Sequence, residues 1–406
     1  MEKIKRICAL VEQHQAWRGS CLNMIASESV TSPLVEAILA SDLSRRYFGE
    51  SYSGIRVFAE LFEIATELAK AVFSAAYADI RPVTGNVAGL SAVTALTRPG
   101  DTIITSPGEY GGYPLGITGW ANIRLLSHPF DPDAYNIIVD AAREQILREK
   151  PQLVVVGMSE FLFPHPVREL TEAAHEVGAF VWYDGAHVMG LIAGGQFQDP
   201  LGDGVDIMTG STHKTFPGPQ RGIVLTNGSE IQDRLNGVLG HAPVFLLSCI
   251  HDNTAAALAA ALAEFQEYGE AFAEQIVRNA QSLGTSLVEN GVPLFGVDCG
   301  ITRSHQVLIK TPSFGSPQAV RMQGLLEESG IISDCIPRLG VQELTRLGME
   351  EAEMQQVASF AADAVLERRP PKEIRKETAA LAAEFQTLHY SCQNGEQAYE
   401  LIGKLL

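Results

Sequence analysis

The stretch QLVVVGMSEFLFPHPVRELTEAAHEVGAFVWYD, residues 152–184, contains two apolar runs with an amphipathic segment between them. The runs QLVVVGM (152–158) and AFVWYD (179–184) are short and rich in β-branched and aromatic residues, which is typical of buried strands. VRELTEAAHEVG (167–178) has the spacing of a helix that buries one face. A strand, a helix and a second strand in this order predict parallel strands joined by a crossover helix.

The pattern continues along the chain and predicts an α/β protein with two domains. DIMTG (206–210) and GIVLTN (222–227) are further candidate strands. An alanine-rich pattern from Asp252 to about Asn290 predicts one long helix, which we expect to join the domains. A shorter α/β pattern then runs to about Leu366. We interpret ERRPPKEIRK (367–376) as a turn or linker before two closing helices.

From these boundaries we expect three parts of the chain. They are an N-terminal arm (1–45), a large ligand-binding domain (46–265) and a small C-terminal domain (266–406). The N-terminus, MEKIKRICALVEQHQAW, has the pattern of an amphipathic helix that charged residues interrupt.

Composition excludes several classes of partner. With 406 residues and 46% hydrophobic content, the chain can bury a large core and a smaller one. A net charge of -18 leaves no basic surface for nucleic acid or an anionic membrane. No apolar run after the N-terminal segment reaches the roughly 18 residues of a membrane span. The six cysteines form no CxxC pair, so we expect reduced, mostly buried thiols, a cytoplasmic location and a small-molecule substrate.

Lys214 lies in TGSTHKTFPGPQRG (209–222), just after a predicted strand. Open α/β sheets bind ligands beyond the carboxyl ends of their strands. A lysine held there can form a Schiff base with a carbonyl group. An isolated THK sequence is more often a surface lysine that follows a strand.

The YDGAH sequence adds a carboxylate at another strand end. Asp184 ends a predicted strand, and His187 follows three residues later. An aspartate in this position can hold the proton on a pyridinium nitrogen, which pyridoxal phosphate needs in order to accept electrons. His187 could then lie against the ring or its phenolic oxygen. The alternative is a turn with a satisfied core histidine, and a metal site is disfavoured because no third ligand is suitably spaced.

PVTGNVAGLSAV (82–93) predicts a phosphate-binding helix start. Thr84, Gly85 and Asn86 stand where a helix of small residues begins. Free N–H groups and the positive end of the helix dipole favour a dianion there. On its own the sequence could be a simple N-cap. Together with the lysine, aspartate and histidine, it predicts a pyridoxal phosphate site.

Four longer motifs resemble the serine hydroxymethyltransferase family, and the resemblance covers nearly the whole chain. They are NMIASESVTSP (23–33), YDGAHVMGLIAGG (183–195), STHKTFPGPQRG (211–222) and RLGVQELTRLGM (338–349). FLFPHPV and AGGQFQDPL are similar to the archaeal-type branch, near the threonine transaldolases. The resemblance implies fold type I of the pyridoxal phosphate enzymes, with a mostly parallel sheet. It also implies a homodimer whose active sites lie at the subunit interface.

The resemblance also implies roles for individual residues around the cofactor. Lys214 would bind pyridoxal phosphate covalently, Asp184 would pair with the pyridinium nitrogen, and His187 and His213 would be close neighbours. The expected phosphate and ring contacts are Thr84, Gly85 and Asn86 for the phosphate, Ser159 for the ring oxygen and Tyr110 stacked on the ring.

For the substrate, the resemblance implies that Arg338 binds the amino-acid carboxylate, a task that suits a planar fork of donors. Ser27 would assist it. Tyr47 and Glu50 match residues that the partner subunit contributes, with Glu50 a candidate proton carrier near the β-hydroxyl. Judged without the resemblance, Arg338 could be a surface arginine and Glu50 a solvated loop carboxylate.

The chain departs from the family pattern at three places that bear on the reaction. It has Val57 and Phe58 where many members have a tyrosine pair, Gln220 where an arginine is common, and GVLGHAPVFLLSC (237–249) in place of a glycine-rich segment. The expected reaction is cleavage of serine to glycine with one-carbon transfer to tetrahydrofolate or another tetrahydropterin. α-Methylserine hydroxymethyltransferase and threonine transaldolase or aldolase are the alternatives, and a non-catalytic cofactor-binding subunit is an alternative of a different class.

Overall fold

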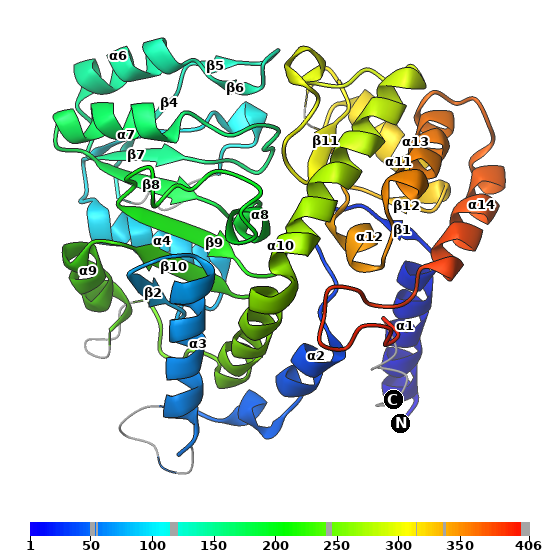
Figure 1. Cartoon of the computed structure of the whole chain (residues 1–406), viewed down its shortest axis with the longest axis horizontal. Coiled ribbons are helices and arrows are strands. Elements are labelled where there is room, and N and C mark those ends of the chain that lie inside the picture. The colour runs from blue at the N-terminus through cyan, green and yellow to red at the C-terminus, as the bar shows by residue number, and fades with distance from the viewer. Residues whose placement is uncertain are drawn as a thin grey trace.

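The computed structural model describes residues 1–48, 53, 56–113, 121–240, 246–313, 315–335 and 338–398. In this part of the chain the largest sheet has seven strands in the order β2-β10-β9-β8-β7-β3-β4 (Figure 1). The strands are β2 (Tyr77–Asp79), β3 (Thr102–Thr105), β4 (Arg124–Ser127), β7 (Leu153–Val156), β8 (Phe180–Asp184), β9 (Ile207–Ser211) and β10 (Gly222–Thr226). β10 is antiparallel to β2 and β9, and the other pairs are parallel. The predicted α/β sheet and its four predicted strands are confirmed.

Helices cover both faces of this sheet (Figure 1). Successive side chains of a strand point to opposite faces, so β7 sends Leu153 and Val155 to one apolar cluster and Val154 and Val156 to another. The first cluster lies under α4 (Gly85–Leu96) and α9 (Ser229–Leu239). The second lies under α3 (Phe58–Val72), α6 (Val139–Glu149), α7 (Val167–Glu176) and α8 (Met189–Ala193). Burial on both faces explains why the strands are almost continuously apolar.

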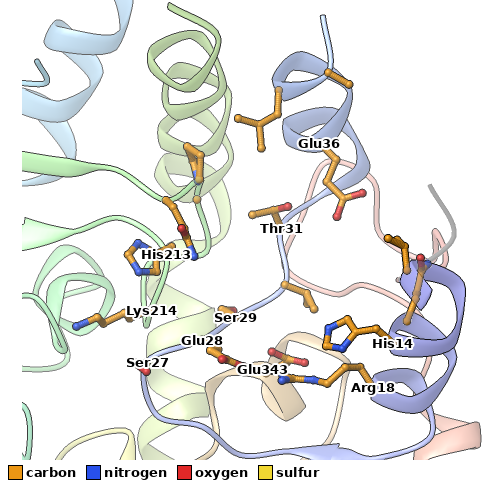
Figure 2. Close-up of a pocket in the computed structure, with 18 residues that line it drawn as sticks. His14, Arg18, Ser27, Glu28, Ser29, Thr31, Glu36, His213, Lys214 and Glu343 are labelled. Carbon is orange, nitrogen blue, oxygen red and sulfur yellow. Dashed lines mark hydrogen bonds and ion pairs between the residues drawn. The ribbon is translucent and has the colours of Figure 1, made fainter. Parts of the chain in front are cut away.

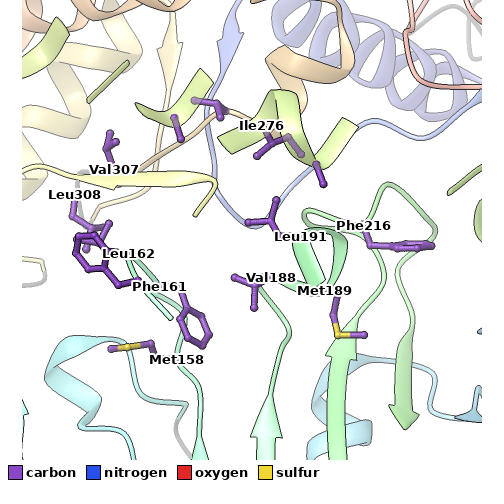
Figure 3. Close-up of a cluster of buried hydrophobic side chains, with 14 of the residues drawn as sticks. Met158, Phe161, Leu162, Val188, Met189, Leu191, Phe216, Ile276, Val307 and Leu308 are labelled. Carbon is purple, nitrogen blue, oxygen red and sulfur yellow. The ribbon is translucent and has the colours of Figure 1, made fainter. Parts of the chain in front are cut away.

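The long helix that the alanine-rich sequence predicted is confirmed as α10 (Asp252–Glu289). It lies between the sheet and the C-terminal elements (Figure 1). The second apolar cluster continues across it. Figure 3 shows Leu191 of α8 and Ile276 of α10 in the same cluster as Val307 and Leu308. This shared core holds the carboxyl edge of the sheet against the C-terminal part of the chain.

The C-terminal elements form a smaller α/β layer. Its strands are β11 (Gln306–Leu308), β12 (Ile331–Ile332) and β13 (Arg338–Gly340), and its helices are α11 (Pro317–Glu328), α12 (Gln342–Arg346), α13 (Glu351–Val365) and α14 (Pro371–Glu384). β11 and β13 pair antiparallel. β1 (Leu22–Asn23) pairs parallel with β12, so the N-terminal segment is joined to this layer. The domain limits expected from the sequence stay predictions.

The described residues also contain several short helices, strands and 3-10 turns. They are α2 (Pro33–Leu39), β5 (Phe130–Asp131), β6 (Asn136–Ile137) and the 3-10 turns η1 (Asp42–Arg45), η2 (Gly108–Tyr110) and η3 (Val297–Cys299).

The sequence interpretation of residues 367–376 is wrong in part. We expected a linker followed by two helices, but α14 already begins at Pro371. Proline suits the first helical turn, where its missing N–H has no helical partner and its φ is already helical. Within the described residues, α14 is the one helix after α13, and 399–406 lie outside that part of the chain.

The N-terminal helix α1 (Glu2–Gly19) forms as predicted but buries no residue. Its apolar residues Ile4 and Ile7 are each 60% exposed. All six cysteines are free, as expected, but the expectation that most are buried is wrong: only Cys21 is, and Cys299 and Cys392 are exposed. Cys299 ends the 3-10 turn η3, and Cys392 lies in a turn after α14, so both are outside the long helices and the strands. No described helix is both long and apolar enough to cross a membrane.

Candidate active site

Three strand ends meet at the carboxyl edge of the sheet. β7, β8 and β9 are neighbouring parallel strands, and Tyr183 and Asp184 of β8 pair with Val156 of β7 and Thr209 of β9 respectively. Asp184 ends β8, and Lys214 follows three residues after the end of β9. Parallel strands end at one edge, so the fold brings these side chains together as the sequence predicted.

The surroundings of Lys214 favour its uncharged form. Burial lowers the pKa of its ammonium to about 8, the carboxylate of Asp184 acts in the opposite direction, and the positive charge of Arg338 lowers the pKa further. These effects place Asp184 and Arg338 near the amine. Near neutral pH, a useful fraction of the lysine is therefore nucleophilic.

Asp184 has one carboxylate oxygen held by the protein. Its Oδ1 accepts the N–H of Ala186 at 3.0 Å. Burial raises the pKa of Asp184, while the Ala186 N–H and then Lys214 lower it. Among the described residues no donor is hydrogen-bonded to Oδ2, so that oxygen is available to a ligand.

Two buried histidines beside the lysine have unsatisfied ring nitrogens. Nδ1 of His187 and Nδ1 of His213 are buried and have no hydrogen-bond partner among the described residues. Burial lowers the pKa of His213 to about 4 and that of His187 well below its usual value, so both rings are neutral. His187 stacks on His305 with centroids 5.9 Å apart. His187 is therefore not a satisfied core histidine, and buried atoms without partners indicate a polar ligand.

The start of α4 faces the same edge. Thr84 is the N-cap, and its Oγ1 accepts the N–H of Val87 at 3.1 Å. The N–H groups of Gly85 and Asn86 have no partner among the described residues. A Cβ on Gly85 would lie 2.3 Å from Oγ of Ser211, so glycine is required for the helix to approach β9. The free N–H groups and the helix dipole suit a phosphate.

Ser159 and Tyr110 are close to each other but already have protein partners. Oγ of Ser159 donates to the carbonyl oxygen of Gly111 at 3.0 Å. One face of Tyr110 stacks on Phe130, with centroids 4.6 Å apart and an interplanar angle of 18°. The other face is the one that could meet a cofactor ring. The expected roles of both residues stay predictions.

Arg338 is the first residue of β13 and is only 5% exposed. Its Nε and Nη2 donate to Oδ2 of Asp334 at 2.9 and 2.6 Å, and Nη1 donates to the carbonyl oxygen of Ser159 at 2.6 Å. Arg338 also affects the pKa values of Lys214 and His187. It is therefore a buried residue at the site and not a surface arginine.

A cleft of about 1150 Å³ opens beside the lysine (Figure 2). Ser27, His213 and Lys214 all line it, together with α1. The segment that carries Ser27 is fixed by two side chains. His305 is hydrogen-bonded to the carbonyl oxygen of Ala26 at 3.1 Å, and Gln342 donates to the carbonyl oxygens of Ile25 and Glu28. Ser27 is thus held in the cleft that Lys214 also lines, and its role as a substrate contact stays a prediction.

Two expected residues are not placed in this cleft. Glu50 lies outside the described residues. Tyr47 is 54% exposed and does not line the cleft. Val57 and Phe58 replace the tyrosine pair of the family pattern. Val57 is exposed, and Phe58 is fully buried in the core.

The structure adds five residues that sequence reasoning missed. Glu160, Tyr135 and Asp334 surround Arg338, while Tyr113 donates to Oδ1 of Asn86 and His305 stacks on His187. Glu160 could have been found because it follows Ser159 at the same strand end. The other four come from loops whose place relative to the sheet has no sequence signal.

A parallel sheet with a desolvated lysine, a carboxylate and a helix start at its carboxyl edge defines a pyridoxal phosphate enzyme of fold type I. The unsatisfied histidine nitrogens, Oδ2 of Asp184 and the free N–H groups of α4 fit that cofactor. Residues 2–361 match the sequence model of the family described as serine hydroxymethyltransferase. The chain belongs to the serine hydroxymethyltransferase family, as its motifs predicted, and is a pyridoxal phosphate-dependent transferase.

Individual relatives agree with this assignment. The serine hydroxymethyltransferase of Pyrococcus abyssi is 39% identical over 414 residues, covering 96% of this chain and 97% of that protein. That of Methanopyrus kandleri is 41% identical over 424 residues, covering 98% of each. Among solved structures, L-threonine transaldolase from Pseudomonas fluorescens in its internal aldimine state is similar, with a TM-score of 0.87 and 27% identity over 97% of this chain and 96% of that one.

Proposed function

We propose that this protein catalyses the reversible cleavage of serine to glycine, with transfer of the one-carbon unit to a tetrahydropterin. The observation that carries the proposal is the desolvated Lys214, on whose pKa the carboxylate of Asp184 and the buried guanidinium of Arg338 both act. Membership of the family and the names of its archaeal members support it.

We assign a cofactor contact to each of the site residues at the carboxyl edge of the sheet. Pyridoxal phosphate, when bound, supplies the electron sink that lets bonds at the α-carbon of an amino acid break. Lys214 would hold it covalently, and Oδ2 of Asp184 would keep its ring nitrogen protonated. The remaining contacts would be Thr84, Gly85 and Asn86 at the phosphate and Tyr110, Ser159 and His187 around the ring.

Arg338 and Ser27 would bind the amino-acid carboxylate. Fixing that group orients the bond between Cα and Cβ, and correct orientation is a large part of catalysis. His213 is neutral and adjacent to Lys214 in the chain, so its buried Nδ1, which has no partner among the described residues, could form a hydrogen bond with a group bound there. Removal of the β-hydroxyl proton needs a base, for which Glu50 is our candidate, with Tyr47 next to it.

We propose further that the enzyme is a cytoplasmic homodimer whose partner contributes Tyr47 and Glu50. Ile4, Ile7 and Val11 of α1 have helical spacing and are all exposed, which indicates an apolar face suited to a partner. Tyr47 and Phe48, on the segment that carries the candidate base, are exposed too. The occupant we favour is a second copy of this chain. The six free thiols fit a reducing compartment.

A mixing experiment tests the shared site. Lys214→Ala and Glu50→Gln should each be nearly inactive. A mixed dimer has one site with neither substitution if Glu50 comes from the partner, so co-refolded protein should regain about a quarter of wild-type activity. The expected wild-type mass in solution is that of a dimer. A monomer, or a mixture as inactive as its components, would contradict the proposal.

The substrate assay compares serine, α-methylserine and threonine, each with and without tetrahydrofolate. Serine should yield glycine much faster with the pterin than without it. The Arg338→Ala variant is the control, and it should turn over none of the three amino acids. Absence of serine turnover under every condition would refute the main proposal.

Threonine transaldolase is the second candidate, because the solved transaldolase superimposes on nearly the whole chain. It predicts pterin-independent release of acetaldehyde from threonine and capture of the remaining glycine unit by another aldehyde. If only this reaction is seen, the transaldolase assignment replaces the hydroxymethyltransferase.

A further inference from the structure

The guanidinium of Arg338 is held by one acidic neighbour along one edge. Nε and Nη2 both donate to Oδ2 of Asp334, whereas Nη1 donates to the carbonyl oxygen of Ser159. A guanidinium carries five N–H donors, so one donor on Nη1 and one on Nη2 remain after these three bonds. Those two donors suit the two oxygens of a substrate carboxylate.

A second acid lies close enough to compete for the same guanidinium. Glu160 is buried, and its pKa, raised by burial, is affected by the charges of both Arg338 and Asp334. In the described structure, however, the arginine side chain is hydrogen-bonded to Asp334 and not to Glu160. The phenol of Tyr135 instead donates to Oε2 of Glu160. Two acids thus flank Arg338, and a tyrosine engages one of them.

We propose that Asp334 is the positioning residue for Arg338, and that Tyr135 keeps Glu160 from replacing it. Asp334 selects the edge of the guanidinium that faces the amino-acid carboxylate. This inference rests on the proposed function, in which Arg338 binds that carboxylate.

The short connection between two strands makes this arrangement possible. Only residues 333–337 separate β12 from β13, which places Asp334 four residues before Arg338. The backbone N–H of Arg338 also points to Oδ1 of Asp334, at 3.4 Å. The carboxylate therefore contacts both the side chain and the backbone of the residue that it orients.

Asp334 has two opposite effects on a bound carboxylate. Its negative charge repels the carboxylate of the ligand. Its hydrogen bonds with Nε and Nη2 of Arg338 hold the guanidinium so that the two remaining N–H donors face the ligand. The Asp334 side chain is 20% exposed and that of Arg338 is 7% exposed, so water screens part of the repulsion. We therefore expect the orientation of Arg338 to outweigh the repulsion. If it does, removal of the Asp334 carboxylate weakens ligand binding; if repulsion is larger, removal strengthens it.

The test uses cofactor-loaded protein with Asp334→Ala, Asp334→Asn and Tyr135→Phe. The matched control is Glu230→Ala, which removes an acid–arginine pair of the same spacing from the surface of α9. Calorimetry gives the Kd of glycine and of glycinamide, steady-state kinetics give KM and kcat for serine, and visible absorption and thermal unfolding report cofactor content and folding.

Asp334→Ala should raise the glycine Kd and the serine KM about tenfold or more, because a charge-assisted fork is lost. It should lower kcat by a smaller factor, because the same contact also orients the bond between Cα and Cβ. Asp334→Asn should lie between it and wild type, and Tyr135→Phe should raise the Kd in the same direction. Glycinamide has no carboxylate, so its binding should be the same in every variant. Glu230→Ala should match wild type throughout.

Two results would overturn the proposal while the proposed function stands. An unchanged glycine Kd in Asp334→Ala means that Arg338 needs no positioning, and a lower Kd means that Asp334 competes with the substrate. If Asp334→Ala does not fold, wild-type Kd values in both Asp334→Asn and Tyr135→Phe overturn the proposal equally. Wild-type protein that binds neither glycine nor serine would instead refute the proposed function itself.

Discussion

At the scale of single residues, burial sets the chemistry of the site. Lys214, His187 and His213 all have lowered pKa values chiefly because of burial, and burial raises the pKa of Asp184. Each shift favours the uncharged form, because charge is costly in a medium of low dielectric constant. The charge of Lys214 on one side and the Ala186 N–H on the other keep Asp184 able to act as an anion.

Asp184→Asn isolates the contribution of that charge. The amide has nearly the same size and can still accept the N–H of Ala186, so the variant should retain bound cofactor. It should lose activity by a factor of about 100 or more, since an amide cannot hold a proton on the ring nitrogen. Cofactor content from the absorption spectrum and turnover of serine measure the two effects separately. Near-normal turnover would refute the role of Asp184.

At the scale of elements, the position of the α4 helix start depends on a contact with β9. The N-terminus of α4 can approach the sheet edge only because residue 85 has no Cβ, which would lie 2.3 Å from Oγ of Ser211. A second close approach involves Gly222 of β10. A Cβ added to Gly222 would lie 2.2 Å from the carbonyl oxygen of Thr84. Two glycines thus set the distance between the candidate phosphate site and the strand that leads to Lys214.

Gly85→Ala should destabilise the fold by about 1–3 kcal/mol through overpacking and should weaken cofactor binding. Because the colliding atom is a side-chain oxygen, the double variant Gly85→Ala with Ser211→Ala should recover much of the loss. Urea unfolding and titration with pyridoxal phosphate give both quantities, and Ser211→Ala alone is the control. Additive losses in the double variant would show that this contact is not the cause.

At the scale of the whole molecule, buried neutral histidines link stability to pH. Burial lowers the pKa of His128 to about 4, and that of His165 and His305 to about 3. Their unfolded pKa is near 6.5. The unfolded chain therefore binds more protons below pH 6.5. The stability present above that pH is lost as pH falls toward 4 for His128 and toward 3 for His165 and His305. Each histidine removes up to about 1.4 kcal/mol per pH unit in this window.

His165→Leu tests this linkage away from the active site. Both ring nitrogens of His165 are buried without a hydrogen-bond partner among the described residues. The ring packs on that of Phe161, with the two ring centroids 4.6 Å apart. An apolar side chain should therefore cost little at pH 7.5. At pH 5 the variant should be more stable than wild type, which urea unfolding at both values can measure. An equal dependence on pH in the two proteins would exclude His165 as a contributor.

The sequence alone determined the local elements and the family. The strands around residues 153–226, the helix start at Thr84 and the strand-end positions of Asp184 and Lys214 follow from periodicity and turn chemistry, which act over a few residues. The C-terminal linker was misjudged because a proline at a helix start and a proline in a loop are alike in sequence.

Only the tertiary structure decided which distant residues meet. Asp334 is hydrogen-bonded to Arg338, Tyr135 to Glu160, and His305 stacks on His187. Nothing in the local sequence pattern marks Asp334, Tyr135 or His305 as residues of the site. The physical reason is that burial and charge are properties of the packed chain. A carboxylate or an imidazole acquires its pKa and its partners from the elements that close around it. Those elements come from distant segments of the chain, as in the bond between the imidazole of His305 and the carbonyl oxygen of Ala26, 279 residues apart.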